Sequence, residues 1–323
     1  MGLHVGGSIR SLLRDRDVGR ADPWLLGALV LGLSIRLAVA PFSGDLDHDV
    51  RIWIETGKGL YEGRNPYTFG FFFGTSAEDN IGYMSPWPVL NFLSYGLSVL
   101  LFPGNLNVLV GLIKLPVILA DLAVGVVIYR FILHRTEDPT GARRGLSLWL
   151  FNPLVIYVSS IYGMFDSLPA LFTLLSVCSF VDERYDLSAV CLAVGIAFKT
   201  YPVITVPLFL MFLVNMGRKS QVVRYVEVLI LVLSSLSLPF LVWDSRSYVC
   251  NVICHLWRPI HGFTLINAAQ FYLGPHLADI SLSVFLIGVP ITLALFHRCN
   301  PPENIAFNGC LAVLLSFLAF FKV

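Results

Sequence analysis

Three aspartates, Asp45, Asp47 and Asp49, lie within five positions of one another, directly after the first apolar run of the chain. Charged residues make up only 13% of the sequence, about half of their share in an ordinary soluble protein. A carboxylate can take a proton from an attacking hydroxyl group, and neighbouring carboxylates can hold a divalent cation. The cluster therefore predicts a general base or a cation site, and the alternative is the solvated start of a loop.

Cationic side chains occur in two further stretches. Lys199 lies in AFKTYPV, inside a continuous apolar stretch, whereas His255, Arg258 and His261 lie in HLWRPIHGFT. A lysine at membrane depth costs about 2.5–3.5 kcal/mol on insertion scales, which makes it a functional candidate, although a long side chain can also reach out to the interface. Cations of this kind can stabilise the charge that builds on a phosphate leaving group. Ordinary interfacial residues are the alternative for the two histidines.

Polar residues inside apolar segments give a second set of candidates. Asp166 lies in SSIYGMFDS, where it could take part in a reaction or cap the helix that follows. Lys114 and Asp121 are seven residues apart and so lie on one face of a helix, about 10.5 Å apart along its axis. We interpret these two residues as structural polar contacts within a helix bundle.

The composition is that of a multi-pass membrane protein. Hydrophobic residues make up 56% of the 323 residues, and the net charge of +1 gives no reason to expect a nucleic-acid partner. A helix needs about 20 apolar residues to cross a bilayer. We predict an all-α fold in one transmembrane domain over residues 1–323. The candidate segments are 24–42, 85–103, 107–133, 145–161, 167–181, 187–198, 201–214, 226–243, 277–296 and 305–322.

Positive charges predict the topology, because lysines and arginines favour the cytoplasmic side. Arginines gather before residue 24, between 130 and 144, and between 218 and 224. The rule then places two long connections, a first outer loop at 43–84 and a second at 244–262, on the opposite side. It also makes 85–103 a re-entrant or interfacial segment. The segments that flank Lys199 are short and suggest broken helices, which need protein or a cavity around them.

No motif for a soluble activated substrate is present: the chain has neither a GxGxxG fingerprint nor a P-loop. If the protein is an enzyme that acts on an activated group, this group must arrive on a lipid. A lipid or solute transporter is the main alternative, but transporters often carry repeated halves, and we find no internal repeat. A membrane scaffold without activity is a third reading, which leaves Lys199 and the aspartates unexplained.

Four stretches resemble one family. LWLFNPLVIYVSSIYGMFDSLPAL (148–171), GIAFKTYPVITVPLF (195–209), HLWRPIHGFT, and DHDV followed by EGRNPY and YMSP resemble the PIG-M family, the catalytic subunits of GPI mannosyltransferase I. The first of these stretches and the last, DHDV with EGRNPY and YMSP, also resemble the broader GT-C glycosyltransferases. The resemblance covers most of residues 45–323.

The resemblance implies a GT-C-like helix bundle and an inverting transfer of a sugar, with mannose the first choice. The donor would be dolichyl- or polyprenyl-phosphate sugar, and the acceptor a lipid-linked sugar or glycolipid. The site would lie on the lumenal or extracellular face of an endoplasmic reticulum or prokaryotic plasma membrane. A small membrane partner subunit and a bound divalent cation are compatible with it, and no metal ligands are assigned.

The resemblance also assigns roles to residues. Asp47 and Asp49 match an Asp-x-Asp motif, which makes them the catalytic candidates and Asp45 an additional acid. Donor-phosphate binding is expected from Lys199, Arg258 and His255. The further candidates are Asp166, Tyr201, Arg64, Tyr67 and His261.

Two departures from the family pattern are visible. The family stretch after VSS tends to read Arg-Gly-Asn-Ala-Asp-Ser, and here only Gly163, Asp166 and Ser167 match it. We therefore expect a distant relative, with the GPI acceptor in doubt. The chain ends at AFFKV within an apolar run, which predicts a C-terminally truncated member.

Overall fold

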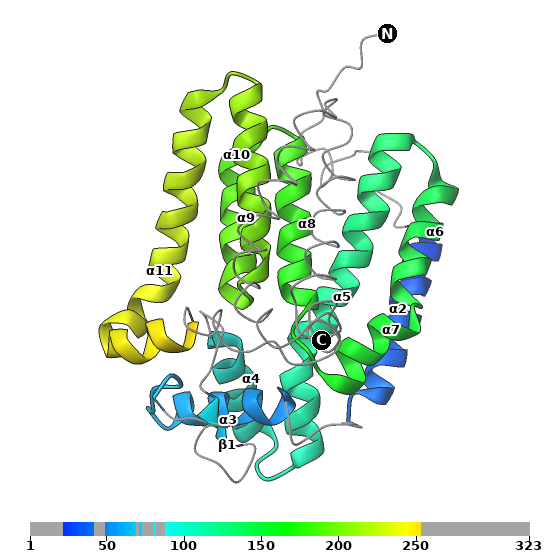
Figure 1. Ribbon diagram of the computed structural model, residues 1–323. Helices are drawn as coiled ribbons and strands as arrows, with labels where there is room; N and C mark the ends of the chain where they lie inside the picture. The colour runs from blue at the N-terminus through cyan, green and yellow to red at the C-terminus, as the bar shows by residue number, and fades with distance from the viewer. Residues whose placement is uncertain (1–21, 42–48, 69–70, 73–79, 82–87, 253–323) are drawn as a thin grey trace, which may run out of the picture.

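A computed structural model describes residues 22–41, 49–68, 71–72, 80–81 and 88–252 (Figure 1). Several predicted features therefore lie outside the described residues. These are Asp45, Asp47, His255, Arg258, His261, the segments 277–296 and 305–322, and the greater part of the two predicted outer loops.

The described structure is a helix bundle, which confirms the predicted all-α membrane fold. Its only strands in that part of the chain are β1 (Phe71–Phe72) and β2 (Asn80–Ile81), an antiparallel pair in which Phe71 is opposite Ile81. The helices are α2 (Pro23–Val39), α3 (Asp49–Tyr61), α4 (Val89–Leu101), α5 (Leu106–Thr136), α6 (Pro139–Leu150), α7 (Pro153–Ile156) with the π-helix η2 (Tyr157–Tyr162), α8 (Ser167–Val181), α9 (Tyr185–Phe198), the 3-10 helix η3 (Tyr201–Ile204), α10 (Thr205–Asn215) and α11 (Lys219–Val252).

Two of these helices, α5 with 31 residues and α11 with 34, are long and apolar enough to cross a membrane. A third candidate is α6 together with the segment Pro153–Tyr162, which meets it at a bend of 44°. At 1.5 Å per residue, α5 is about 46 Å long, well above the bilayer core of about 30 Å. The chain is an integral membrane protein, and its other apolar helices in the described part are shorter than a typical span.

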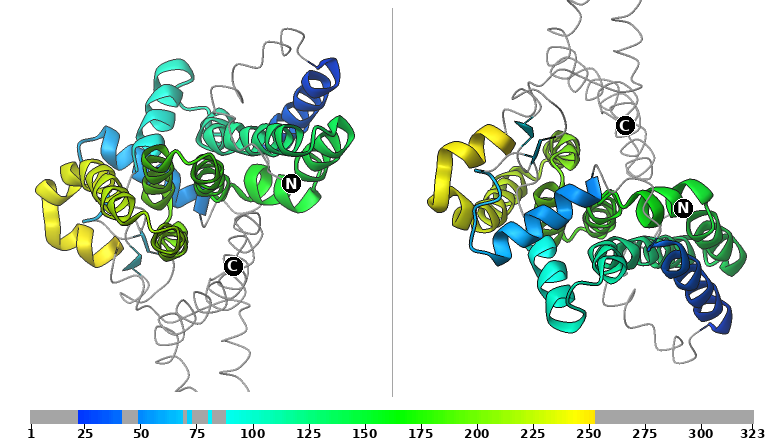
Figure 2. Two further views of the ribbon diagram at one scale, coloured as in Figure 1. Left: turned by 90° about the horizontal axis from the view of Figure 1, so that it is seen from above. Right: turned by 90° about the horizontal axis from the view of Figure 1, so that it is seen from below.

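Paired arginines gather at one end of the bundle. This end, here called the cationic end, carries the α5–α6 and α10–α11 connections (Figure 1). Four ion pairs tie neighbouring helices together there: Arg135 with Asp182, Arg143 with Asp22, Arg218 with Glu183, and Arg224 with Asp186. The opposite end is here called the α3 end, because α3 and α4 lie across it beside the last turns of α11 (Figures 1 and 2).

The helices α3 and α4 approach each other closely at Gly57. A Cβ atom at this position would lie 2.8 Å from Cβ of Tyr95 and would overlap the carbonyl oxygen of Asn91. Glycine is therefore required for the crossing. Helix α4 has 13 residues and is about 20 Å long, which is too short to span the bilayer core.

Two boundaries differ from those expected from the sequence. The segment expected at 145–161 begins already at Pro139, because Asp138 caps α6 by accepting a hydrogen bond from Thr140 N. The polar stretch from 244 to 252 is helical and not an irregular loop. There α11 kinks at Asp244, whose carboxylate accepts hydrogen bonds from the backbone N and the hydroxyl of Ser247 and so caps the continuing helix.

Candidate functional site

The segment from Tyr157 to Ser167 positions one of the candidate carboxylates, and Lys114 of α5 holds this segment in place. Its ammonium group donates hydrogen bonds to the carbonyl oxygens of Ala40 at 2.9 Å, Ser160 at 3.0 Å and Ile161 at 2.8 Å. Lys114 is fully buried. It thus joins the end of α2 to the end of η2, where helix carbonyls lack partners of their own.

Gly163 ends η2 in a left-handed conformation, with φ of +81°. A Cβ atom there would lie 2.7 Å from Cγ2 of Val50 and 3.0 Å from Cε of Lys114. Two requirements therefore meet at this residue: a positive φ, which glycine adopts at little cost, and the close approach of α3 to α5.

Asp121 lies two turns after Lys114 in α5. It accepts hydrogen bonds from both flanks of the segment from Tyr157 to Ser167. Its carboxylate receives the hydroxyl of Ser159 at 2.7 Å and that of Ser167 at 2.8 Å, and it pairs with Nε of Arg36 at 3.1 Å. Arg36 and Asp121 are fully buried. Lys114 and Asp121 are structural contacts, as predicted, and both bind the segment from Tyr157 to Ser167. Arg36 was visible in the sequence only as a charge interrupting an apolar run.

Asp166 and Lys199 form an ion pair between α8 and α9 at the α3 end of the bundle. The ammonium nitrogen of Lys199 is 2.6 Å from Oδ1 of Asp166, and the two side chains are 40% and 29% exposed. Lys199 ends α9 with an extended backbone, and the turn Tyr201–Ile204 with its Pro202 separates it from α10. Asp166 directly precedes α8 and makes no capping bond. Its carboxylate is therefore directed to the lysine, and the capping role considered for it is not seen.

Helix α3 brings Asp49 to this end of the bundle. The helix begins at Asp49, and the next residue, Val50, is fully buried where it meets Gly163. One turn later, the ring of Trp53 stacks on that of Phe165 with centroids 4.4 Å apart. The backbone of Asp49 thus lies beside the segment that carries Asp166.

The remaining described candidates lie around the same end. Tyr201 is buried directly after the Lys199 turn. Arg64 is exposed and pairs with Glu62 at 2.6 Å. Tyr67 is buried and is a structural anchor, because its ring packs edge-on against Phe240 and Tyr248, on either side of the kink in α11.

Within the part of the chain that the structure describes, no group of three or more His, Cys, Asp or Glu side chains could hold a metal ion. A cation held by the aspartate cluster stays a prediction, because Asp45 and Asp47 lie outside that part.

Comparison with curated proteins identifies three similar sequences, all named GPI mannosyltransferase 1. The protein of Saccharomyces cerevisiae is 25% identical over 296 residues, which cover 86% of this chain and 68% of that protein. The Candida albicans protein is 24% identical over 251 residues, or 72% of this chain and 58% of its own length. The Gibberella zeae protein is 24% identical over 182 residues, or 54% and 37%. No protein-family model matches the chain.

The chain is thus similar, at 24–25% identity, to proteins named GPI mannosyltransferase 1. This relationship confirms the resemblance to PIG-M-like GT-C glycosyltransferases that the motifs indicated, and with it the class of enzyme. The low identity agrees with the departures from the family pattern after VSS. The match to the Candida albicans relative spans only 58% of that protein, and that to the Gibberella zeae relative 37%.

Proposed function

We propose that this protein transfers a sugar, with mannose the first choice, from a polyprenyl-phosphate donor such as dolichyl phosphate mannose to a lipid-linked or glycolipid acceptor. The relatives' names supply the reaction class. The observation that carries the proposal is the ion pair between Lys199 and Asp166, at 2.6 Å, between short helices of an apolar bundle. Ionisable side chains among the apolar helices of a membrane protein are rare and are candidates for a substrate site.

In this proposal Lys199 binds the phosphate of the donor. Its side chain is 40% exposed, so a lipid phosphate can reach the ammonium group from the open side. Negative charge grows on that phosphate as the sugar leaves, and a fixed cation stabilises it most in the transition state. Asp166 holds the lysine in place before the donor arrives. Because its carboxylate is already paired, we assign it to positioning and not to proton abstraction.

The base is assigned to Asp49 or Asp47. Its carboxylate takes the proton of the acceptor hydroxyl, the oxygen attacks the anomeric carbon, and the bond to the phosphate oxygen breaks with its electron pair left on the phosphate. Attack from the face opposite the leaving group inverts the anomeric configuration. The position of α3, which begins at Asp49 beside Gly163, supports this assignment. Arg258 and His255 are proposed as further contacts of the phosphate.

The arginines gathered at one end of the bundle support an orientation in the membrane. The cationic end, with Arg135, Arg143, Arg218 and Arg224, would face the cytoplasm. The α3 end would then face the lumen of the endoplasmic reticulum or the cell exterior. A lipid-linked donor fits this side, because it carries the activated sugar in the membrane and the reaction then needs no nucleotide sugar.

The test is transfer by membranes that contain the protein, with radiolabelled polyprenyl-phosphate mannose or glucose and extraction of the labelled lipid. We expect a labelled glycolipid from the mannosyl donor. The anomeric configuration of the transferred sugar should be opposite to its configuration in the donor. Asp49→Asn should lower turnover by about 10²–10⁴-fold, as loss of a general base does. Asp47→Asn should cost less and Asp45→Asn little. Normal turnover in both Asp49→Asn and Asp47→Asn would contradict the assigned base.

A metal arm completes this test. If a chelator abolishes transfer by the wild-type protein and manganese or magnesium restores it, the aspartates are cation ligands and not the base.

A further inference from the structure

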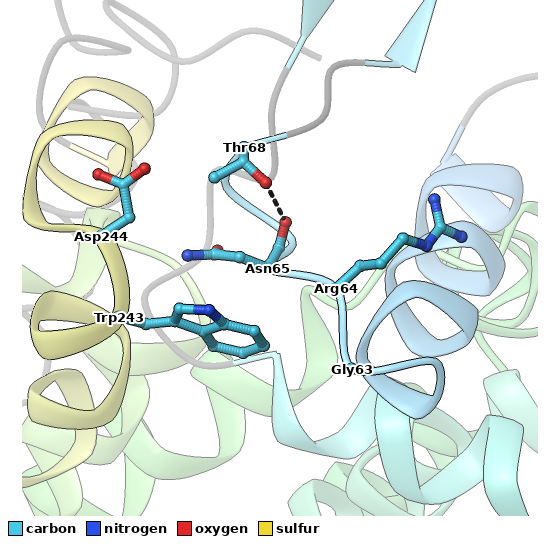
Figure 3. A pocket seen from close by; sticks show the side chains of 6 residues that line it. All are labelled: Gly63, Arg64, Asn65, Thr68, Trp243 and Asp244. Atoms are coloured by element: carbon cyan, nitrogen blue, oxygen red, sulfur yellow. Dashed lines mark hydrogen bonds between the residues drawn. The ribbon is translucent and has the colours of Figure 1, made fainter.

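A pocket of about 390 Å³ opens at the α3 end, between the loop that follows α3 and the kink in α11 (Figure 3). Neither Lys199 nor Asp49 is among the described residues that line it. Its lining residues are Gly63, Arg64, Asn65, Thr68, Trp243 and Asp244.

The amide of Asn65 is the most informative group in this pocket. Asn65 is only 6% exposed, and its Oδ1 accepts a hydrogen bond from the backbone N of Tyr67 at 2.9 Å. This bond fixes the orientation of the amide, so Nδ2 must point the other way. Nδ2 is buried and has no hydrogen-bond partner within the described residues. A buried donor without an acceptor costs about 1–3 kcal/mol, so a partner from outside is expected.

Figure 3 shows what this amide group faces: Nδ2 of Asn65 extends over the ring of Trp243 toward the side on which Asp244 lies. Trp243 is 48% exposed, so its ring face is open to a ligand. Ser247 donates to both carboxylate oxygens of Asp244. An ionised carboxylate has about four acceptor sites, which leaves room for a hydroxyl donor.

The walls of the pocket are held rigidly. The backbone oxygen of Tyr67 accepts a hydrogen bond from Nδ2 of Asn251 at 2.8 Å, and the hydroxyl of Thr68 donates to the carbonyl oxygen of Asn65 at 2.9 Å. The loop and the two limbs of α11 therefore form one unit. A site of this kind can orient a ligand without reorganisation.

An aromatic ring face, an amide donor and a carboxylate acceptor together match a ring that has an apolar C–H face and several hydroxyl groups. An anion fits less well, because Asp244 would repel it and Arg64 is paired with Glu62. We propose that this pocket binds a hexose or cyclitol ring, with one hydroxyl accepting from Asn65 and another donating to Asp244. Given the proposed function, the ring belongs to the sugar of the donor or to the headgroup of the acceptor.

Direct binding tests this proposal without any transfer step. The full chain is purified in detergent and titrated with methyl α-mannopyranoside, myo-inositol and tetrahydropyran, and saturation transfer from protein to the ring protons is followed by NMR. We expect saturation of the mannoside or of inositol, and none of tetrahydropyran, which lacks hydroxyl groups. Binding of the mannoside alone assigns the pocket to the donor sugar, and binding of inositol alone to the acceptor headgroup.

Two variants assign the binding to this pocket. Asn65→Asp keeps the acceptor for Tyr67 N but replaces the free donor with a charged acceptor in the pocket that Asp244 also lines, and Trp243→Leu removes the ring. Each should weaken binding about three- to tenfold, as expected for one lost contact, whereas Trp24→Leu, at the cationic end, should bind like the wild type. Equal binding by all variants, or no saturation of either ring, would overturn the proposal. Loss of transfer with intact ring binding would count against the proposed reaction alone.

Discussion

Removing the carboxylate of Asp121 should lower the temperature at which the bundle unfolds. Asp121 is fully buried and serves Arg36, Ser159 and Ser167 at once. Asp121→Leu leaves the guanidinium of Arg36 buried and without its counter-ion. Breaking one side of a buried ion pair costs about 3–5 kcal/mol, a large part of a total stability of about 5–15 kcal/mol. At about 2–4 °C per kcal/mol, the midpoint should fall by about 6–20 °C.

Heating in detergent with a thiol-reactive fluorophore measures this midpoint in a background that keeps Cys178 as its one cysteine, because Cys178 is buried in the folded protein whereas Cys250 is exposed. The double variant Arg36→Leu/Asp121→Leu should recover at least half of the loss, since an apolar pair of similar volume is often as stable as a buried ion pair. Asp186→Asn breaks an exposed pair with Arg224 and should melt like the wild type. The reasoning is refuted if the double variant loses as much stability as the two single variants combined.

Three further predictions test the architecture. Gly163→Ala should lower both the melting temperature and the rate of transfer. The control Gly104→Ala is also at positive φ but has no atom within 4 Å of the added Cβ, so it should lose only the stability that the backbone strain costs. Equal losses in the two variants would contradict the close approach of Val50 and Lys114 to Gly163. In a cysteine-free background, Thr140→Cys and Glu62→Cys should react with an impermeant reagent from opposite sides of the membrane, and labelling from one side would overturn the proposed orientation. Gly57→Ala should loosen α3 from α4 and expose α3 to proteolysis, and an unchanged digestion pattern would argue against that crossing.

Local sequence patterns predicted the helices that depend on hydrophobicity alone. Segment 107–133 corresponds to α5, Leu106–Thr136, and 167–181 to α8, Ser167–Val181. The lysine predicted to lie between two broken helices ends α9 in the structure. Such features follow from the number of consecutive apolar residues and from nearby prolines.

Contacts between residues far apart in the chain could not be predicted from local sequence patterns. Nothing in the spacing shows that Arg36 meets Asp121, 85 positions away, because the register between two helices is set by packing. The ion pair of Asp166 and Lys199 is of the same kind. Both partners were candidates, but their contact depends on how α8 and α9 pack as a hairpin.

Polar stretches were the other source of difference. Residues 244–252 were expected to be a loop because of their polarity, and they form a helix capped by Asp244. The pocket beside Trp243 follows from that kink, since the tryptophan and Asn65 belong to segments far apart in the chain. A hydrophobicity pattern cannot predict such a pocket.

The most direct test of the proposed reaction is the turnover of Lys199 variants with donor in excess. If Lys199 stabilises the charge on the leaving phosphate, Lys199→Gln should lower turnover by about 10²–10³-fold, the usual effect of losing one such group. Lys199→Arg should keep part of the activity because it keeps the charge. Lys219→Gln, at the cationic end, should transfer sugar like the wild type. Turnover of Lys199→Gln equal to that of the wild type would contradict the account.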